Sequence, residues 1–169
     1  MKSAVMILEE AIKRRDQRHY PFLYIAIDLH GTILTPNRCT HFESGDGTDS
    51  LEVACWIGTR KSEPYPYAYE TLKLISDNFP WIKLILWTSG KKKESKEFVD
   101  NVLENEGIKF WSINDNPDFD GNVYADFSKK FCFDALFDDK AGFDPKTDWS
   151  EIFIFLKNHV NKEESPTEL

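Results

Sequence analysis

The sequence predicts a single three-layer, Rossmann-like α/β domain, with a central, mostly parallel sheet and helices on both faces. Short apolar runs alternate along the chain with segments whose apolar residues recur at helical spacing, which is typical of strand–helix–strand units. Two of the runs, residues 22–27 and 82–87, are almost continuously apolar, as buried parallel strands are. The length of 169 residues is that of one domain, and we find no repeat or linker that divides it.

The composition is that of a folded, acidic chain. Hydrophobic residues make up 41% and aromatic residues 14% of the sequence, which is enough for a core. The net charge of −8 disfavours binding to polynucleotides or to an anionic membrane. Three cysteines cannot all pair with one another, which fits reduced thiols. Because no signal-peptide pattern and no membrane-length apolar stretch occur, we expect a soluble cytoplasmic protein.

The first predicted elements are a helix and a strand. Residues 3–19 have helical spacing, and basic side chains gather in the last turns, where they suit the helix dipole. Tyr20-Pro21 ends this helix. The strand at residues 22–27 follows and stops at Asp28. The apolar face of the helix consists of Val5, Leu8 and Ile12.

Residues 34–66 do not fit a simple connection between a strand and a helix. The segment is too long for one, so we expect an insert or flap that contains a short strand at residues 51–57. It also contains Cys39, His41 and Cys55, but their spacing matches no standard zinc pattern, and we favour no zinc site there.

The middle of the chain alternates between helix and strand. A helix stopped by Pro80 precedes the strand at residues 82–87. A second helix at residues 94–106 is stopped by Gly107 and precedes a strand at residues 108–113. The inward stripe of the first helix is Ala68, Leu72, Ile75 and Phe79, and that of the second is Phe98, Val102 and Leu103.

The last predicted elements are a strand and a long helix. The strand occupies residues 133–137, and the run Asp148 to Glu151 resembles a capping box that starts the helix. We expect the domain to span residues 1–160 and the charged tail at residues 161–169 to be frayed. The core stripe of this helix is Trp149, Ile152, Phe153, Leu156 and Val160.

Each of the four main predicted strands ends in polar residues. Because parallel strands present their carboxyl ends at one edge of a sheet, these residues are expected to gather near the point where strand order reverses. Carboxylates from two strands suit Mg²⁺, and a hydroxyl with a backbone N–H suits a phosphate oxygen. For Asp28 alone, capping of the next turn is the alternative. The polar ends are Asp28, Thr88-Ser89, Asn114-Asp115 and Asp138-Asp139.

The order of these motifs resembles the haloacid dehalogenase (HAD) superfamily of phosphatases that use an aspartate nucleophile. The sequence Asp28-x-x-Gly31-Thr32 follows the first strand, a Thr-Ser pair follows a later one, and a lysine precedes the pair Asp138-Asp139. Within the superfamily, the chain looks like the small members that lack a large cap domain, from about residue 23 to residue 159.

The resemblance implies a role for each matching residue. Asp28 attacks the phosphorus of a phosphomonoester and becomes an aspartyl phosphate, which water hydrolyses. Thr88, or else Ser89, holds the phosphoryl group. Lys130 neutralises it, with the adjacent Lys129 as the competing candidate. The magnesium ligands are Asp28, Asp138, Asp139 and the backbone carbonyl of His30, and the substrate-binding residues are Gly31, Thr32, Ser89 and Gly90.

His30 departs from the family pattern. Most of these phosphatases carry an Asp at this position, which protonates the leaving oxygen and then activates water. A histidine is also able to do acid–base work, so one interpretation is a magnesium-dependent phosphatase in which His30 replaces that Asp, with kcat falling as pH rises. The alternative is a catalytically weak, phosphate-ligand-binding or regulatory protein on the same scaffold.

The substrate is less strongly indicated. The overall acidity favours a small phosphorylated molecule, and a nucleotide is one candidate because Trp56, Tyr65, Tyr67 and Tyr69 are able either to stack on a base or to pack in the core. The run of lysines at residues 91–93 either guides an anionic substrate or is a solvated helix start. Nucleic acid is disfavoured but left open, no membrane partner is expected, and the sequence does not indicate an oligomeric state.

Overall fold

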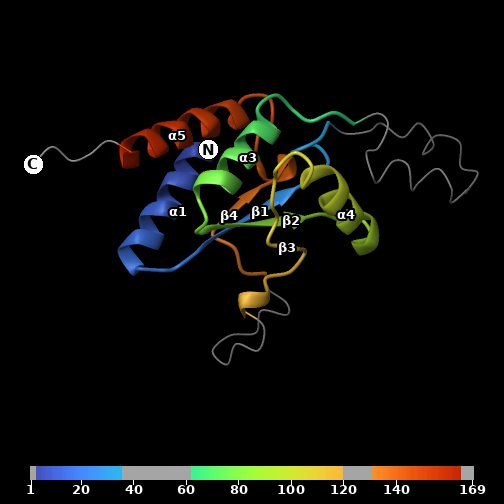
Figure 1. The fold of residues 1–169 in the computed structure, drawn as a ribbon, viewed down its shortest axis with the longest axis horizontal. Coiled ribbons are helices and arrows are strands. Elements are labelled where there is room, and N and C mark those ends of the chain that lie inside the picture. The colour runs from blue at the N-terminus through green and yellow to red at the C-terminus, as the bar shows by residue number, and fades with distance from the viewer. Residues whose placement is uncertain (1–2, 36–61, 120–130, 165–169) are drawn as a thin grey trace, which may run out of the picture.

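The fold is α/β, as the sequence predicts, with four parallel strands in one sheet flanked by helices (Figure 1). The computed structural model describes residues 3–35, 62–119 and 131–164. The predicted strand at residues 51–57 and the three residues considered for zinc lie outside this part. The elements are α1 (Ala4–Arg18), β1 (Leu23–Asp28), α3 (Ala68–Asn78), β2 (Ile82–Trp87), α4 (Lys92–Phe98), the π-helical η2 (Val99–Leu103), β3 (Ser112–Ile113), the 3₁₀ turns η3 (Pro117–Phe119) and η4 (Asp139–Ala141) on either side of β4 (Ala135–Phe137), and α5 (Asp148–Glu164).

The strand order β3-β2-β1-β4 determines where a ligand is expected to bind. The chain adds β2 and β3 successively on one side of β1 and then places β4 on the other side. The order therefore reverses between β1 and β4, and open α/β sheets bind ligands beyond the carboxyl ends of their strands at such a point. Ile27 pairs with Phe137 in this register, so the next residues, Asp28 and Asp138, lie at neighbouring strand ends.

The main core lies between the sheet and three helices. Figure 1 shows α1, α3 and α5 together on one side of the sheet, where α5 contacts both α1 and α3. Ile25 and Leu84 are buried in one hydrophobic cluster with residues of these helices. Trp149 at the start of α5 is fully buried and makes edge-to-face contacts with Phe137 and Phe143. A packed aromatic cluster thus supports the end of β4.

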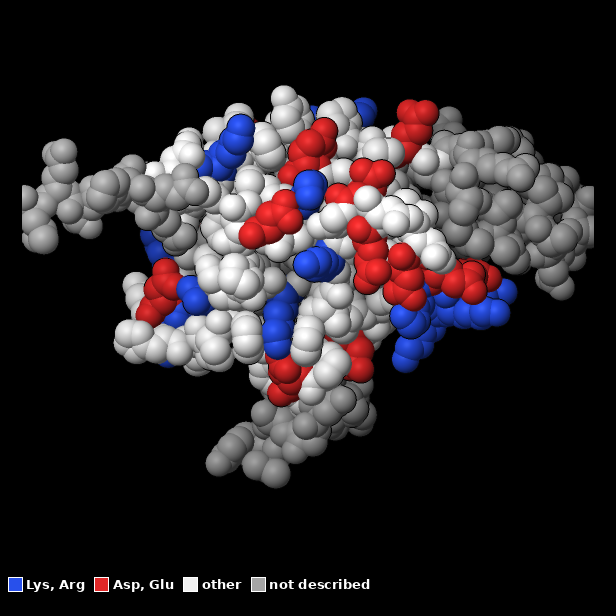
Figure 2. All heavy atoms as spheres, in the orientation of Figure 1, with Lys and Arg blue, Asp and Glu red and all other residues white. Residues whose placement is uncertain are grey.

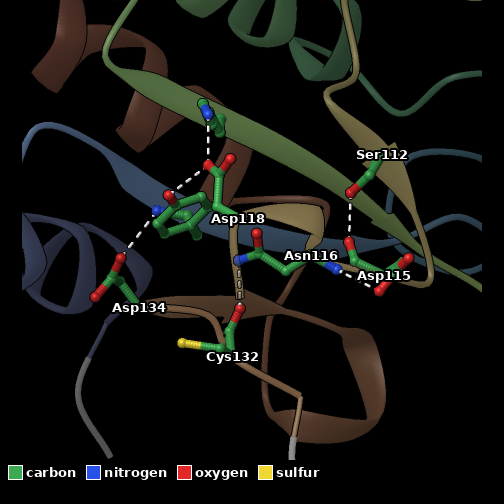
Figure 3. Close-up of polar contacts among 8 residues, drawn as sticks. Ser112, Asp115, Asn116, Asp118, Cys132 and Asp134 are labelled. Carbon is green, nitrogen blue, oxygen red and sulfur yellow. Dashed lines mark hydrogen bonds and ion pairs between the residues drawn. The ribbon is translucent and has the colours of Figure 1, made fainter. Parts of the chain in front are cut away.

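On the other face of the sheet, η3 lies against β1 and β2 in the connection from β3 to β4. Asp118 in η3 accepts a hydrogen bond from the Tyr24 hydroxyl at 2.6 Å and forms an ion pair with Lys83 at 2.5 Å (Figure 3). The Lys83 ammonium also lies 3.8 Å from the ring centroids of both Phe22 and Trp111, in cation–π geometry. These contacts fasten the crossover to β1 and β2.

The helix predicted at residues 94–106 begins earlier and changes type. It starts at Lys92 as an α-helix and continues as a π-helical turn over Val99–Leu103, where Glu104 N–H donates to the Val99 carbonyl. A π turn holds more residues than an α turn, which rotates the following side chains. Phe98 and Leu103 are buried as predicted, but Val102 is 36% exposed, so its predicted inward orientation is wrong.

Two strands are shorter than predicted because side chains take over their first backbone hydrogen bonds. Lys109 N–H donates to the Ser76 hydroxyl of α3, and β3 starts only at Ser112. At the start of β4, the Asp134 carboxylate accepts the Tyr24 N–H, and the strand begins at Ala135 (Figure 3).

The ends of α5 also differ from the prediction. Asp148 is the first helical residue, and its carboxylate accepts the N–H of Asp144, so the predicted capping box does not form. Glu151 N–H donates to the Thr147 carbonyl instead. The helix continues to Glu164, past the predicted start of the frayed tail. Trp149, Ile152 and Leu156 of its stripe are buried, and Phe153 and Val160 are partly buried. No described helix combines the length and apolar character needed to cross a bilayer.

Candidate active site

Three carboxylates meet where the strand order reverses. Asp28 ends β1, while Asp138 and Asp139 follow β4, and each offers an oxygen within 4.8 Å of the other two. The sheet explains the convergence, because β1 and β4 pair in parallel register up to Ile27 and Phe137. The sequence predicted this group from residues 110 positions apart, and the structure brings all three together.

Asp28 is the least solvated member of the group. Burial raises the pKa of Asp28 to about 6, a backbone hydrogen bond from Leu29 opposes the shift, and the nearby Asp138 carboxylate reinforces it. Its Oδ2 atom is buried and has no hydrogen-bond partner among the described residues. A buried carboxylate oxygen without a donor is unfavourable unless a cation or ligand satisfies it.

Gly31 and Thr32 hold the turn after β1 against Asp139. Gly31 has a φ of +91°, and a Cβ atom there would lie 2.8 Å from an Asp139 carboxylate oxygen. Only glycine fits both the left-handed backbone and this close approach. Thr32 is fully buried, and its hydroxyl accepts the Asp139 N–H at 3.0 Å. Thr32 was predicted to bind substrate, and the structure shows it positioning Asp139.

The same turn is anchored to the helical layer by Trp149. The indole N–H of Trp149 donates to the Thr32 carbonyl at 2.8 Å, and the Thr71 hydroxyl of α3 donates to the Trp149 carbonyl at 3.2 Å. All three residues are fully buried, so these hydrogen bonds are shielded from water. From the sequence, Trp149 is predicted only as a core residue. Its anchoring role could have been suspected, because a buried indole N–H needs a hydrogen-bond acceptor.

Thr88 sits at the end of β2, beside β1. Its backbone N–H donates to the Asn114 side-chain carbonyl at 2.7 Å, and the Asn114 amide donates back to the Thr88 carbonyl at 2.6 Å. The Thr88 hydroxyl accepts the Gly90 N–H at 3.2 Å, so its own proton is available to a ligand. The neighbouring Ser89 is exposed. Asn114 was noted in the sequence only as a polar strand end, and its role in holding Thr88 was missed.

His30 lies in the turn between Asp28 and Gly31. Its side chain is partly buried, and its backbone forms a bridge with Leu34. The turn is closed by Gly31 N–H, which donates to the Leu34 carbonyl at 2.7 Å. His30 follows the carboxylate that ends β1 by two residues, and its acid–base role stays a prediction.

The lysine predicted for the site, Lys130, and its competitor Lys129 lie outside the described residues. Within the described part, Lys140 stands directly after the acid pair, with its ammonium 3.8 Å from an Asp139 carboxylate oxygen. Its positive charge acts to lower the pKa of Asp28, against the larger effect of burial. No role is predicted for Lys140 from the sequence, although its position directly after two aspartates was a signal.

Lysines also cluster next to this edge of the sheet. Lys91, Lys92 and Lys93 are exposed at the beginning of α4, three to five residues after Thr88. Figure 2 shows basic side chains gathered at this part of the molecule, beside acidic ones. Lys93 lies 4.0 Å from Glu97, so the cluster belongs to a surface of mixed charge.

Comparison with known proteins identifies no family for this chain. No family model matches it, and no curated protein matches it. Among solved structures, it is similar to a conserved protein from Bacteroides thetaiotaomicron, with 24% sequence identity over 82% of this chain and 92% of that chain. The TM-score is 0.49. A similarity at this level carries no argument about function.

Proposed function

We propose that this chain is a magnesium-dependent phosphomonoesterase that works through an aspartyl phosphate on Asp28, in the manner of the HAD phosphatases that its motifs resemble. The observation that carries the proposal is the meeting of Asp28, Asp138 and Asp139, with oxygens within 4.8 Å of one another at the switch point of the sheet. If no cation lay between them, three carboxylates this close together would repel one another.

The residues fit a hard divalent cation. All three side chains offer carboxylate oxygens, the ligands that Mg²⁺ uses together with phosphate and water. The buried, unpartnered Oδ2 of Asp28 and the raised pKa of that group are both explained if a cation normally compensates the charge. The ion would offset the negative charge of the phosphoryl oxygens and of Asp28 as the two approach.

The first chemical step is assigned to Asp28. Its carboxylate oxygen forms a bond to phosphorus while the bond from phosphorus to the ester oxygen breaks. His30, two residues further on, donates a proton to the departing alkoxide, which leaves as an alcohol. In the second step His30 takes a proton from water, the water oxygen attacks phosphorus, and the Asp28 carboxylate is released with inorganic phosphate.

The remaining residues position the phosphoryl group. Thr88 is held in place by Asn114 and keeps a hydroxyl proton to donate to a phosphoryl oxygen. Lys140 supplies positive charge next to the acid pair, while Lys130 keeps the role that the family resemblance implies for it. Preorganised donors and charges of this kind stabilise phosphoryl transfer more than any single proton transfer does.

The alternative is a phosphate-ligand-binding protein with little turnover, and the residue that separates the two is His30. The test is hydrolysis of p-nitrophenyl phosphate with Mg²⁺ and with EDTA by the wild type, Asp28→Asn, His30→Asp and a control, Asp77→Asn, which removes an exposed carboxylate on α3. A phosphatase requires activity that depends on Mg²⁺, is lost in Asp28→Asn and is kept in Asp77→Asn. Background activity in the wild type together with a many-fold gain in His30→Asp would favour the binding protein.

A further inference from the structure

A cavity of about 280 Å³ lies between α4 and the edge strand β3. Its wall combines aliphatic, aromatic and charged side chains, which is the mixture found in small-molecule sites. The volume is at the small end for such sites, so it suits one ring system and not a whole large ligand. The main lining residues are Lys92, Lys96, Val99, Trp111, Ser112 and Asp115.

Trp111 gives this cavity an aromatic surface of fixed orientation. The side chain is 46% exposed, which is unusual for a residue that adjoins a strand. The Lys83 ammonium lies 3.8 Å from its ring centroid, and Lys83 is itself held by Asp118 in the crossover segment. A ring fixed in this way loses little freedom when a ligand ring stacks on it.

The charges around the cavity balance one another. Lys96 forms an ion pair with Asp100 at 2.6 Å, and Lys92 and Asp115 contribute one charge of each sign. Asp115 is also fixed in place, because its carboxylate accepts the Asn116 N–H at 2.8 Å and its carbonyl accepts the Ser112 hydroxyl (Figure 3). A neutral lining with both donors and acceptors suits an uncharged ring with polar edges and not a second phosphate.

Two residues of the cavity wall are close in sequence to the site proposed for the phosphoryl group. Asp115 follows Asn114, whose side chain is bonded to both backbone groups of Thr88, and Lys92 is four residues after Thr88. β3 is separated from β1 by one strand, so the axes of these two strands are about 10 Å apart across the sheet.

We propose that this cavity binds the nucleobase of a mononucleotide, with Trp111 stacking on the base and Asp115 accepting hydrogen bonds from its polar edge. The proposal rests on the proposed function, because the phosphate of the same molecule is placed at Asp28 and Thr88. It specifies the substrate class, a phosphomonoester whose leaving group carries a planar heterocycle.

Binding is tested first, without turnover. The five tryptophan indole N–H signals of the ¹⁵N-labelled Asp28→Asn protein are followed during titration with AMP and with glycerol 1-phosphate, and the Trp111 signal is identified with Trp111→Phe. We expect AMP, and not glycerol 1-phosphate, to shift the Trp111 signal. Equal responses to both compounds, or none to AMP, would overturn the proposal.

The second experiment measures kcat/KM for AMP and for glycerol 1-phosphate in proteins that keep Asp28. Trp111→Ala is expected to reduce kcat/KM for AMP about 5- to 150-fold more than kcat/KM for glycerol 1-phosphate, as the loss of one stacked base predicts. Tyr20→Ala, which removes an aromatic side chain of similar exposure at the other end of the strands, is the matched control and is expected to leave the ratio unchanged. An unchanged ratio in Trp111→Ala would also overturn the proposal. If neither phosphate is hydrolysed but AMP still shifts Trp111, the cavity assignment stands and the phosphatase assignment fails.

Discussion

The hydroxyl of Thr32 accepts the backbone N–H of Asp139 at 3.0 Å, and this hydrogen bond joins the turn after β1 to the end of β4. Thr32 is fully buried, and its carbonyl accepts the Trp149 indole N–H. The two carboxylate-bearing strand ends are therefore held together by a neighbouring threonine as well as by the ladder between β1 and β4.

Replacing Thr32 by valine keeps the shape of the side chain and removes the acceptor. We expect Thr32→Val to lower the free energy of unfolding by about 1–3 kcal/mol, because the Asp139 N–H loses its partner, and to weaken Mg²⁺ binding by displacing Asp139. Thr32→Ser is the control, since it keeps the hydroxyl. Urea unfolding and Mg²⁺ titration measure the two effects, and equal behaviour of the valine and serine variants would contradict this role.

Asp28 should destabilise the metal-free protein at neutral pH. Its pKa is raised to about 6, above the ordinary value of 3.8, so the folded state binds its proton more tightly than the unfolded chain does. The contribution of Asp28 is therefore most favourable below pH 4 and is lost as pH rises through 6. We expect Asp28→Asn to raise the free energy of unfolding in EDTA by roughly 1–3 kcal/mol at pH 7.5, since one pKa unit corresponds to about 1.4 kcal/mol.

The same variant should give almost no gain at pH 3.5, where the wild-type carboxyl is mostly protonated in both the folded and the unfolded state. Mg²⁺ should stabilise the wild type more than Asp28→Asn, because the ion binds the carboxylate. Thermal unfolding at the two pH values, with and without Mg²⁺, measures this. A wild type that is more stable than Asp28→Asn in EDTA at pH 7.5 would show that Asp28 is already compensated by the protein.

Asp118, unlike Asp28, is expected to stabilise the folded protein at neutral pH. Lys83, followed by the Tyr24 hydroxyl, holds the pKa of Asp118 below its usual range by hydrogen bonding to the carboxylate. The stabilisation is therefore present above pH 4 and is lost as pH falls through the lowered pKa. Because Asp118 is partly exposed, we expect Asp118→Asn to cost only about 1 kcal/mol at pH 7 and still less near pH 3.

The control for Asp118 is Asp77→Asn, which breaks an exposed pair with Lys73 on α3 and should cost about 0.5 kcal/mol or less. Urea unfolding of both variants between pH 3 and pH 7 makes the comparison. A cost for Asp118→Asn that grows on acidification would mean that the carboxylate is not the stabilising species.

His30 is the predicted proton donor and acceptor. We expect His30→Ala to lower kcat for p-nitrophenyl phosphate less than for an alkyl phosphate, because p-nitrophenolate needs less help from an acid to leave. For the alkyl phosphate the loss should be about 10²- to 10⁴-fold. Mg²⁺ affinity should stay within a few-fold of the wild type, since the backbone is unchanged. Equal losses with both substrates would argue that His30 has only a structural role.

The architecture was predictable because its signals are local and repeated. The strand Ile82–Trp87 was predicted to the residue, since its apolar run lies between Pro80, which stops the preceding helix, and the polar Thr88. The errors fall where another part of the fold competes for the backbone. Ser76 takes the Lys109 N–H, Asp134 takes the Tyr24 N–H, and a π turn shifts Val102 outward. None of these contacts can be predicted from the spacing of apolar residues along the chain.

The carboxylate group of the site was also predictable, because parallel strands bring their carboxyl ends together whatever their separation in sequence. The supporting contacts were not. Asn114 holds Thr88, and Trp149 holds Thr32, through side-chain bonds to backbone atoms that depend on the strand register and on the packing of α5. Sequence alone fixes neither of these. Lys129 and Lys130 lie outside the described residues, and their role stays a prediction.

The most direct test of the central claim is chemical trapping at Asp28. Acid-quenched protein from a reaction with Mg²⁺ and a phosphomonoester is reduced with borohydride, which converts an aspartyl phosphate to homoserine, and the peptide that contains residue 28 is sequenced by mass spectrometry. We predict homoserine at position 28 only when substrate and Mg²⁺ are both present, and never in Asp28→Asn. Steady hydrolysis by Asp28→Asn, with aspartate intact at position 28 of the wild type, would contradict the account.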